Sequence, residues 1–76
     1  MIKHIIEYTV KSLVEHPDQV IITSSTQNNK EVFEIRVNVQ DIGKVIGKDG
    51  QSIRAIRMFL YSLIPQGQEI EVVVAK

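Results

Sequence analysis

The chain contains no cysteine and no tryptophan, and its nine basic side chains balance nine acidic ones. Without cysteine it can form neither a disulfide framework nor a thiolate metal site, and nothing indicates an oxidising compartment, so we expect a cytoplasmic protein. A formal net charge of +0 argues against binding nucleic acid through bulk charge. The sequence has no apolar run of about 18 residues, so it predicts neither a membrane span nor a secretion signal.

The length of 76 residues suits one small domain. A domain of this size buries only about 60–65% of the surface that its unfolded chain exposes, so we expect modest stability, to which a partner subunit would add. No linker, internal repeat or low-complexity tract divides the sequence. We therefore expect a single domain over residues 1–76.

The first half of the chain predicts a helix followed by a β-hairpin. Apolar residues at helical spacing, which end before Pro17, are Ile2, Ile5, Ile6, Thr9, Val10, Leu13 and Val14. Residues 20–26 read as a β-branched strand, and residues 27–30 as a polar turn. In the second strand, polar residues alternate with Phe33, Ile35, Val37 and Val39. This pattern indicates a hairpin with one wet face.

The second half predicts two helices and a last strand. Asp41 can cap a short helix over residues 42–46, and a longer helix runs from Gln51 to Ile64 before Pro65. After the turn Pro65-Gln66-Gly67, the last strand alternates Ile70, Val72 and Val74 with Glu69, Glu71 and Val73. The order helix, strand, strand, helix, helix, strand predicts an α+β fold, an α/β sandwich with helices on one face of a three-stranded sheet. The helical crossover allows the last strand to lie parallel to an earlier one.

A glycine-rich turn joins the two later helices, in the segment VIGKDGQSIRAIR over residues 45–57. Gly43, Gly47 and Gly50 are three of the four glycines in the chain. Glycine permits close approach and unusual dihedral angles. The amides from Gly47 to Gly50, with the positive N-terminal end of the following helix, can therefore bind a phosphate.

Basic side chains gather around this turn. Between Gly43 and Arg57, Asp49 is the single acid, and the basic residues are Lys44, Lys48, Arg54 and Arg57. Lys48 places a mobile charge at the tip. The carboxylate of Asp49 repels phosphate, so we expect it to point outward and to weaken binding without abolishing it. Arg54 and Arg57 either contact the ligand or form the solvated face of their helix.

Residues 45–53 resemble the signature of the KH domain, which is an aliphatic pair, Gly-x-x-Gly, two variable positions and an aliphatic residue. The element order is similar to the bacterial, type II KH fold with a mixed sheet, and the resemblance extends from Met1 to Lys76. The chain resembles the small bacterial KhpA-type RNA-binding proteins. This resemblance implies single-stranded RNA as ligand, homodimerisation, and pairing with a KhpB-like partner that affects cell elongation and cell-wall synthesis.

The predicted RNA site is centred on the glycine turn. Its candidate residues are Lys44, Ile46, Gly47, Lys48, Asp49, Gly50, Ser52, Ile53 and Arg54. A KH domain holds about four nucleotides in a groove. We expect the sheet to form the wall of that groove, with an aliphatic floor drawn from Ile42, Val45, Ile46 and Ile53. A helix-turn-helix interpretation is disfavoured, because the first of the two helices is barely two turns long and strands flank the pair.

Met58, Phe59 and Tyr61 are apolar residues beyond those that one core stripe needs. They are either additional core or a surface for a second copy or a partner, and the resemblance favours an interface. A second functional hypothesis follows, in which the chain is chiefly a protein-interaction subunit whose own clamp is vestigial.

The sequence predicts no metal site, cofactor or enzymatic activity. His4 and His16 have no second ligand at a metal-binding spacing, and we interpret them as ordinary surface residues. Glu69 and Glu71 alternate onto the wet face of a strand, and no nucleophile, base or cofactor loop accompanies them.

Overall fold

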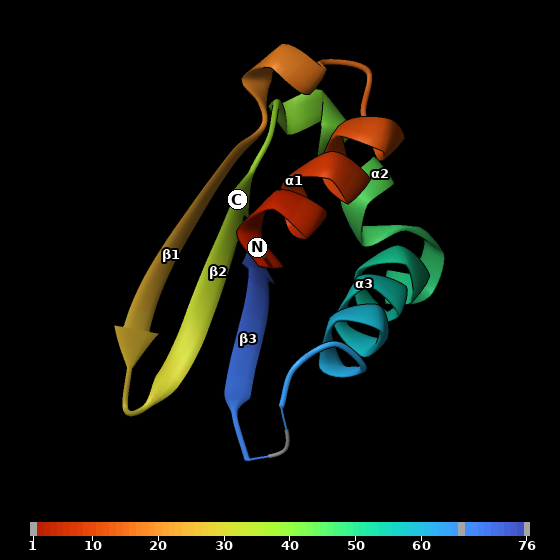
Figure 1. Cartoon of the computed structure of the whole chain (residues 1–76). Helices are drawn as coiled ribbons and strands as arrows, with labels where there is room; N and C mark the ends of the chain where they lie inside the picture. The colour runs from red at the N-terminus through yellow and green to blue at the C-terminus, as the bar shows by residue number, and fades with distance from the viewer. Residues whose placement is uncertain (1, 66, 76) are drawn as a thin grey trace.

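The computed structural model describes residues 2–65 and 67–75, which form three α-helices on one face of a three-stranded sheet (Figure 1). The elements are α1 Ile2–Leu13, β1 Ile21–Gln27, β2 Lys30–Arg36, α2 Ile42–Ile46, α3 Gln51–Tyr61 and β3 Glu69–Val74, with short 3₁₀ turns η1 Pro17–Gln19, η2 Val39–Asp41 and η3 Lys48–Gly50. The predicted order of helices and strands is confirmed, and it is the order of a type II KH fold.

The sheet has the strand order β1-β2-β3. β1 and β2 form an antiparallel hairpin, and β3 returns through the two helices to lie parallel to β2. The hairpin turns at Asn28 and Asn29, which have φ values of 52° and 64°. Two successive positive φ values define a type I′ turn, which asparagine tolerates and which matches the twist of paired strands.

The hydrophobic core lies between the sheet and the helices. Its buried residues are Ile6, Val10, Val20, Ile22, Phe33, Ile35, Val45, Ile53, Ile56, Leu60, Ile70 and Val72. Every helix and every strand contributes to this cluster. The alternation predicted for the last strand is confirmed over residues 69–72, because Ile70 and Val72 are buried while Glu69 and Glu71 are exposed, but Val73 and Val74 are both half-buried.

Two predicted boundaries were wrong. β2 ends at Arg36, and Val39 is 78% exposed at the start of η2, because the Asn38 side chain accepts a hydrogen bond from the Gln40 amide at 2.8 Å and starts a 3₁₀ turn. α3 ends at Tyr61, three residues earlier than predicted. There the Leu63 amide donates to the Leu60 carbonyl at 2.9 Å, a tighter turn that ends the helix before Pro65.

Asp41 has a different role from the one predicted. Its side chain forms no capping bond to α2. It is fully buried, and its two carboxylate oxygens accept hydrogen bonds from the amides of Glu15 at 3.1 Å and His16 at 3.0 Å. The carboxylate therefore ties the segment after α1 to the start of α2. Among the described residues, it is the one charged side chain that is buried.

The predicted turn Pro65-Gln66-Gly67 includes Gln66, which lies outside the described residues, as do the predicted domain ends Met1 and Lys76. Gly67 has a φ of 92°, consistent with a turn. Among the described helices, none combines the length and the apolarity that a membrane crossing requires.

We expect Asp41→Ala to lower the free energy of unfolding by about 2–3 kcal/mol, because it leaves two amides in a partly buried segment without their charged acceptor. Urea denaturation monitored by circular dichroism measures this change in the free energy of unfolding. Asp18→Ala, at an exposed position in η1, is the matched control and should change stability by less than about 0.5 kcal/mol. Equal losses in the two variants would contradict a structural role for the Asp41 carboxylate.

Candidate nucleic-acid interface

The glycine turn, Gly47–Gly50, has a backbone that favours glycine at both ends. Gly47 has φ 76° and ψ 172°, and Gly50 has φ 75° and ψ 16°. The Gly47 amide donates to the Gly43 carbonyl at 2.8 Å and completes α2, and the Gly50 amide donates to the Gly47 carbonyl at 3.1 Å. Positive φ at both ends reverses the chain between α2 and α3 within four residues.

Gly47 also allows the turn to approach α3 closely. A Cβ atom at this position would lie 2.4 Å from the Ser52 Oγ and 2.8 Å from the Ser52 amide nitrogen. Real Cβ atoms do not approach neighbours so closely. The two predicted site residues Gly47 and Ser52 are thus brought into direct contact, and a side chain at position 47 would push the turn away from the start of α3.

Asp49 suits the tip of the turn for a conformational reason. Its φ of 55° and ψ of 27° lie in the left-handed region, which aspartate and asparagine enter more readily than most residues with side chains. The Asp49 side chain is exposed. Arg54 folds back over the turn, where its guanidinium donates to the carbonyls of Asp49 and Gly50, the latter at 3.4 Å. A positive charge therefore lies against the turn.

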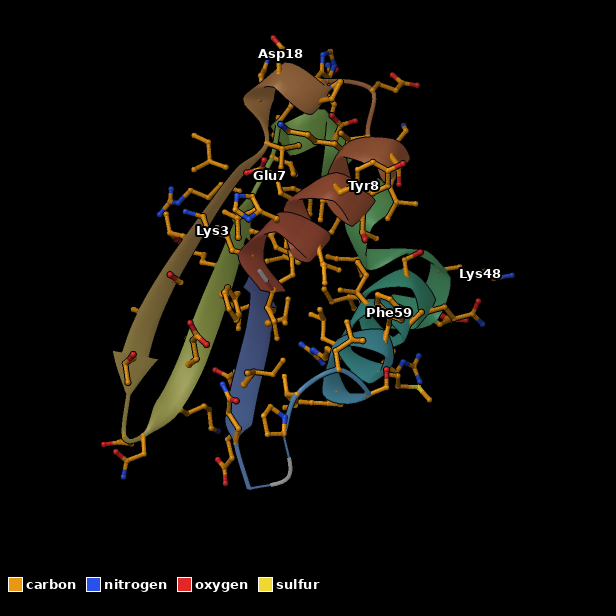
Figure 2. The ribbon with its side chains drawn as sticks, in the orientation of Figure 1. Lys3, Glu7, Tyr8, Asp18, Lys48 and Phe59 are labelled. Atoms are coloured by element: carbon orange, nitrogen blue, oxygen red, sulfur yellow. The ribbon has the colours of Figure 1, made fainter. Side chains whose placement is uncertain are left out.

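The turn combines the N-terminal end of a helix with a basic side chain. α3 begins immediately after Gly50 and has no acidic residue in its first turn, so the positive end of its dipole is not neutralised from within the helix. Figure 2 shows the Lys48 side chain extending away from the ribbon at the tip. The arrangement suits an anion such as a phosphodiester.

Other predicted site residues occupy different environments. Lys44 lies on α2 with its Nζ 3.6 Å from the Glu15 Oε1, an exposed ion pair that contributes little stability. Ile53 is 7% exposed and belongs to the core, so it supports the turn from inside. Val45 is also fully buried, which leaves Ile42 and Ile46, both half-buried, as the exposed aliphatic part of the predicted groove floor.

A basic and aromatic face of α3 meets the free edge of β3. The Arg57 guanidinium donates to the Val72 carbonyl at 3.3 and 3.0 Å, and the Tyr61 hydroxyl donates to the Ile70 carbonyl at 3.2 Å. Arg57 is therefore not simply part of the solvated face of α3, because its guanidinium is hydrogen-bonded to β3. Sequence reasoning missed this pairing. The available signal was the spacing of four between Arg57 and Tyr61, which puts both on one side of a helix.

The predicted interface residues do not share one surface. Tyr61 faces β3, whereas Phe59 lines two apolar cavities between α3 and α1, one of them also lined by Tyr8. Met58 is 72% exposed and lines neither cavity. Figure 2 shows Tyr8 and Phe59 on these two helices. Tyr8, which is 79% exposed, was not predicted, because one exposed aromatic residue on an amphipathic helix gives no signal in sequence.

Glu15, His16 and Asp41 bring possible metal-ligand atoms within 4.8 Å of one another. Both oxygens of Asp41 already accept amide hydrogen bonds, and its side chain is fully buried. The hydrogen bonds from the Glu15 and His16 amides to the Asp41 carboxylate explain why these three residues lie close together, so their proximity gives no argument for a metal.

The type II element order and the glycine turn between α2 and α3 together define a KH domain. The family described as "KhpA/KhpB, KH domain" matches residues 3–75. The chain therefore belongs to the KhpA/KhpB family of KH-domain proteins.

Curated relatives agree with this assignment. The RNA-binding protein KhpA of Thermotoga maritima is 35% identical over 74 residues, which cover 97% of this chain and 99% of that protein. KhpA of Oceanobacillus iheyensis is 37% identical, with 88% and 89% coverage, and KhpA of Chlamydia muridarum is 41% identical, with 80% and 78% coverage. No solved structure matches the chain significantly.

We expect Gly47→Ala to destabilise the protein by about 2 kcal/mol or more, from the cost of positive φ and the contact with Ser52. Gly43→Ala is the matched control: it lies in α2, a Cβ there meets nothing within 4 Å, and it should stabilise by about 0.5–1 kcal/mol. Chemical denaturation of both variants measures the difference. A Gly47→Ala variant as stable as the wild type would contradict the close approach.

Proposed function

We propose that the protein is a single KH domain that binds single-stranded RNA through the glycine turn. The observation that carries the proposal is the glycine turn itself, in which positive φ values at Gly47 and Gly50 lead the chain directly into α3, whose first turn has no acidic residue, with Lys48 in the turn. Names of relatives add support, since each of the three KhpA proteins cited above is called an RNA-binding protein.

In this mechanism, the turn holds the sugar-phosphate backbone and carries no sequence information. The amides and Lys48 contact phosphate oxygens, while Arg54 adds positive charge beside them. Bases then lie between α3 and the free edge of β3, where Arg57 and the carbonyls of Ile70 and Val72 offer donors and acceptors. This edge is our candidate for the groove wall that the sequence left unassigned.

Binding by one domain should be weak and sensitive to salt. With two or three phosphate contacts, the logarithm of affinity falls with the logarithm of salt concentration at a slope near 0.7 per contact. The single acid in the turn, Asp49, lowers affinity further. A second module, supplied by a second copy or a KhpB-like partner, would raise the effective concentration of RNA sites. We propose, from the family resemblance, that such a pair acts in cell elongation and cell-wall synthesis.

Lys48→Asp should remove measurable binding of short single-stranded RNA, because it reverses the charge at the tip and adds a second carboxylate beside Asp49. Fluorescence anisotropy with a labelled RNA pool at two salt concentrations measures this. Lys3→Asp, an equally large charge change on an exposed residue of α1, should lose much less affinity. A folded Lys48→Asp variant that binds as the wild type does, with the same salt dependence, would contradict the clamp.

A second candidate function is that of a protein-interaction subunit. Two features favour it: the apolar cavities between α1 and α3, and the exposure of Phe59 at 54% and Tyr8 at 79%. An apolar surface of this kind suits the side chain of a protein partner. On this hypothesis the protein acts chiefly by assembling with its partner, and the glycine turn contributes little.

Phe59→Asp should weaken association with a second copy or a KhpB-like protein, while leaving RNA binding by the monomer unchanged. Light scattering and co-purification measure association. Met58→Asp is the matched control, because Met58 is exposed but lines neither cavity, and it should have a smaller effect. If cellular phenotypes follow Phe59→Asp and ignore Lys48→Asp, the interaction hypothesis is favoured over RNA binding.

A further inference from the structure

The two edges of the sheet differ in whether other parts of the protein contact them. On the β3 edge, the carbonyls of Ile70 and Val72 accept hydrogen bonds from side chains of α3. On the β1 edge, Figure 1 shows no helix or strand of the described residues lying outside the strand. Residues 23–29, from the middle of β1 through the hairpin turn, are all exposed.

β1 lacks the features that usually protect an exposed edge. Exposed edge strands commonly carry lysine, proline or a bulge, which prevent pairing with another chain. Residues 20–29 contain no charged residue and no proline, and β1 pairs with β2 residue for residue without a bulge. The strand is rich in threonine and isoleucine, which favour β structure.

The hairpin turn determines which groups of β1 face outward. In a two-residue hairpin, the flanking residues, here Gln27 and Lys30, form a hydrogen-bonded pair, and such pairs then alternate along the ladder. The amides and carbonyls of Ile22, Ser24 and Thr26 therefore point away from β2. They form a row of unpaired donors and acceptors, with Ser24 at the centre of the strand.

We propose that this edge pairs with β1 of a second copy, antiparallel and centred on Ser24. In that register Ser24 lies opposite Ser24, and Ile22 lies opposite Thr26 on both sides of the two-fold axis. All three pairs are of the hydrogen-bonded kind, so about six hydrogen bonds form between the copies. A register shifted by one residue would set the outward-facing groups of one strand opposite inward-facing groups of the other, and these hydrogen bonds would be lost.

Charge and side-chain size are compatible with this pairing. Ser24 is small, and the uncharged strands do not repel one another. The same register places Gln27 opposite Ile21 and Asn28 opposite Val20 of the other copy, so no charged side chain of one β1 strand lies against another. One short strand pair is small beside a standard interface, so dimerisation should be weak and concentration-dependent.

The pairing would join the two three-stranded sheets into one continuous sheet. Directly opposed residues project from the same face, so the helices of both copies, and with them both glycine turns, would lie on one side. Two RNA sites would then be presented together, on the edges away from the dimer axis. This last consequence depends on the RNA-binding function proposed above, whereas the pairing itself does not.

Single-cysteine crosslinking tests the pairing, because the natural chain has no cysteine. Opposed residues of a hydrogen-bonded pair have Cα atoms about 5.5 Å apart, within disulfide range. Ser24→Cys should therefore form a disulfide-linked dimer under mild oxidation. Thr26→Cys is the matched control on the same exposed edge. Its two copies would lie about 14 Å apart, beyond disulfide range, so it should crosslink at least about tenfold more slowly.

The experiment uses the full chain without RNA, so its result does not depend on whether RNA binds. Reaction of both variants with a thiol reagent verifies that the two cysteines are equally accessible, and circular dichroism verifies folding. Selective crosslinking of Ser24→Cys supports the pairing. Equal crosslinking of the two variants, faster crosslinking of Thr26→Cys, or no crosslinking in either would overturn it. A dimer that formed through Phe59 alone would not favour crosslinking at Ser24 over Thr26, so the experiment distinguishes that mode of association from β1 pairing.

Discussion

The buried carboxylate of Asp41 is the constraint on which the position of the glycine turn depends. It accepts hydrogen bonds from the amides of Glu15 and His16, and so fixes the segment after α1 against the residue that directly precedes α2. α2 has only five residues and ends at Ile46, directly before Gly47, so little chain separates this anchor from the turn. A charged hydrogen-bonded anchor is costly to break once buried, which makes the start of α2 a rigid base for the site.

α3 connects this site to the sheet through three faces. Its buried face, with Ile53, Ile56 and Leu60, joins the core. A second face donates from Arg57 and Tyr61 to β3, and a third carries Phe59 toward α1. RNA binding and protein association, as proposed, therefore use opposite sides of one helix. Both surfaces can be occupied together, and single substitutions can separate them.

Sequence periodicity predicted the order and type of every helix and strand, because each has one buried face. It failed where local hydrogen bonds outweigh the pattern: Asn38 starts a 3₁₀ turn before Val39, and α3 tightens at Leu63. The glycine turn was visible because its φ values require a specific residue type. The roles of Asp41 and Arg57 were not predictable, since their partners are backbone groups 25 and 15 residues away, and backbone groups carry no sequence signal.

Zero net charge is compatible with a nucleic-acid site because the charges are segregated by the fold. The turn and α3 contribute Lys48, Arg54 and Arg57, while Glu69 and Glu71 are exposed on β3, on alternate positions from its buried residues. Screening limits the reach of exposed charges to about 8–10 Å at physiological salt, so acids on the far face of the sheet reduce local attraction little. These acids still reduce the long-range electrostatic attraction that would steer RNA toward the protein. The RNA-binding function proposed above therefore depends on contacts at short range, and a second glycine turn on the same RNA would add more affinity than additional basic residues elsewhere on the surface.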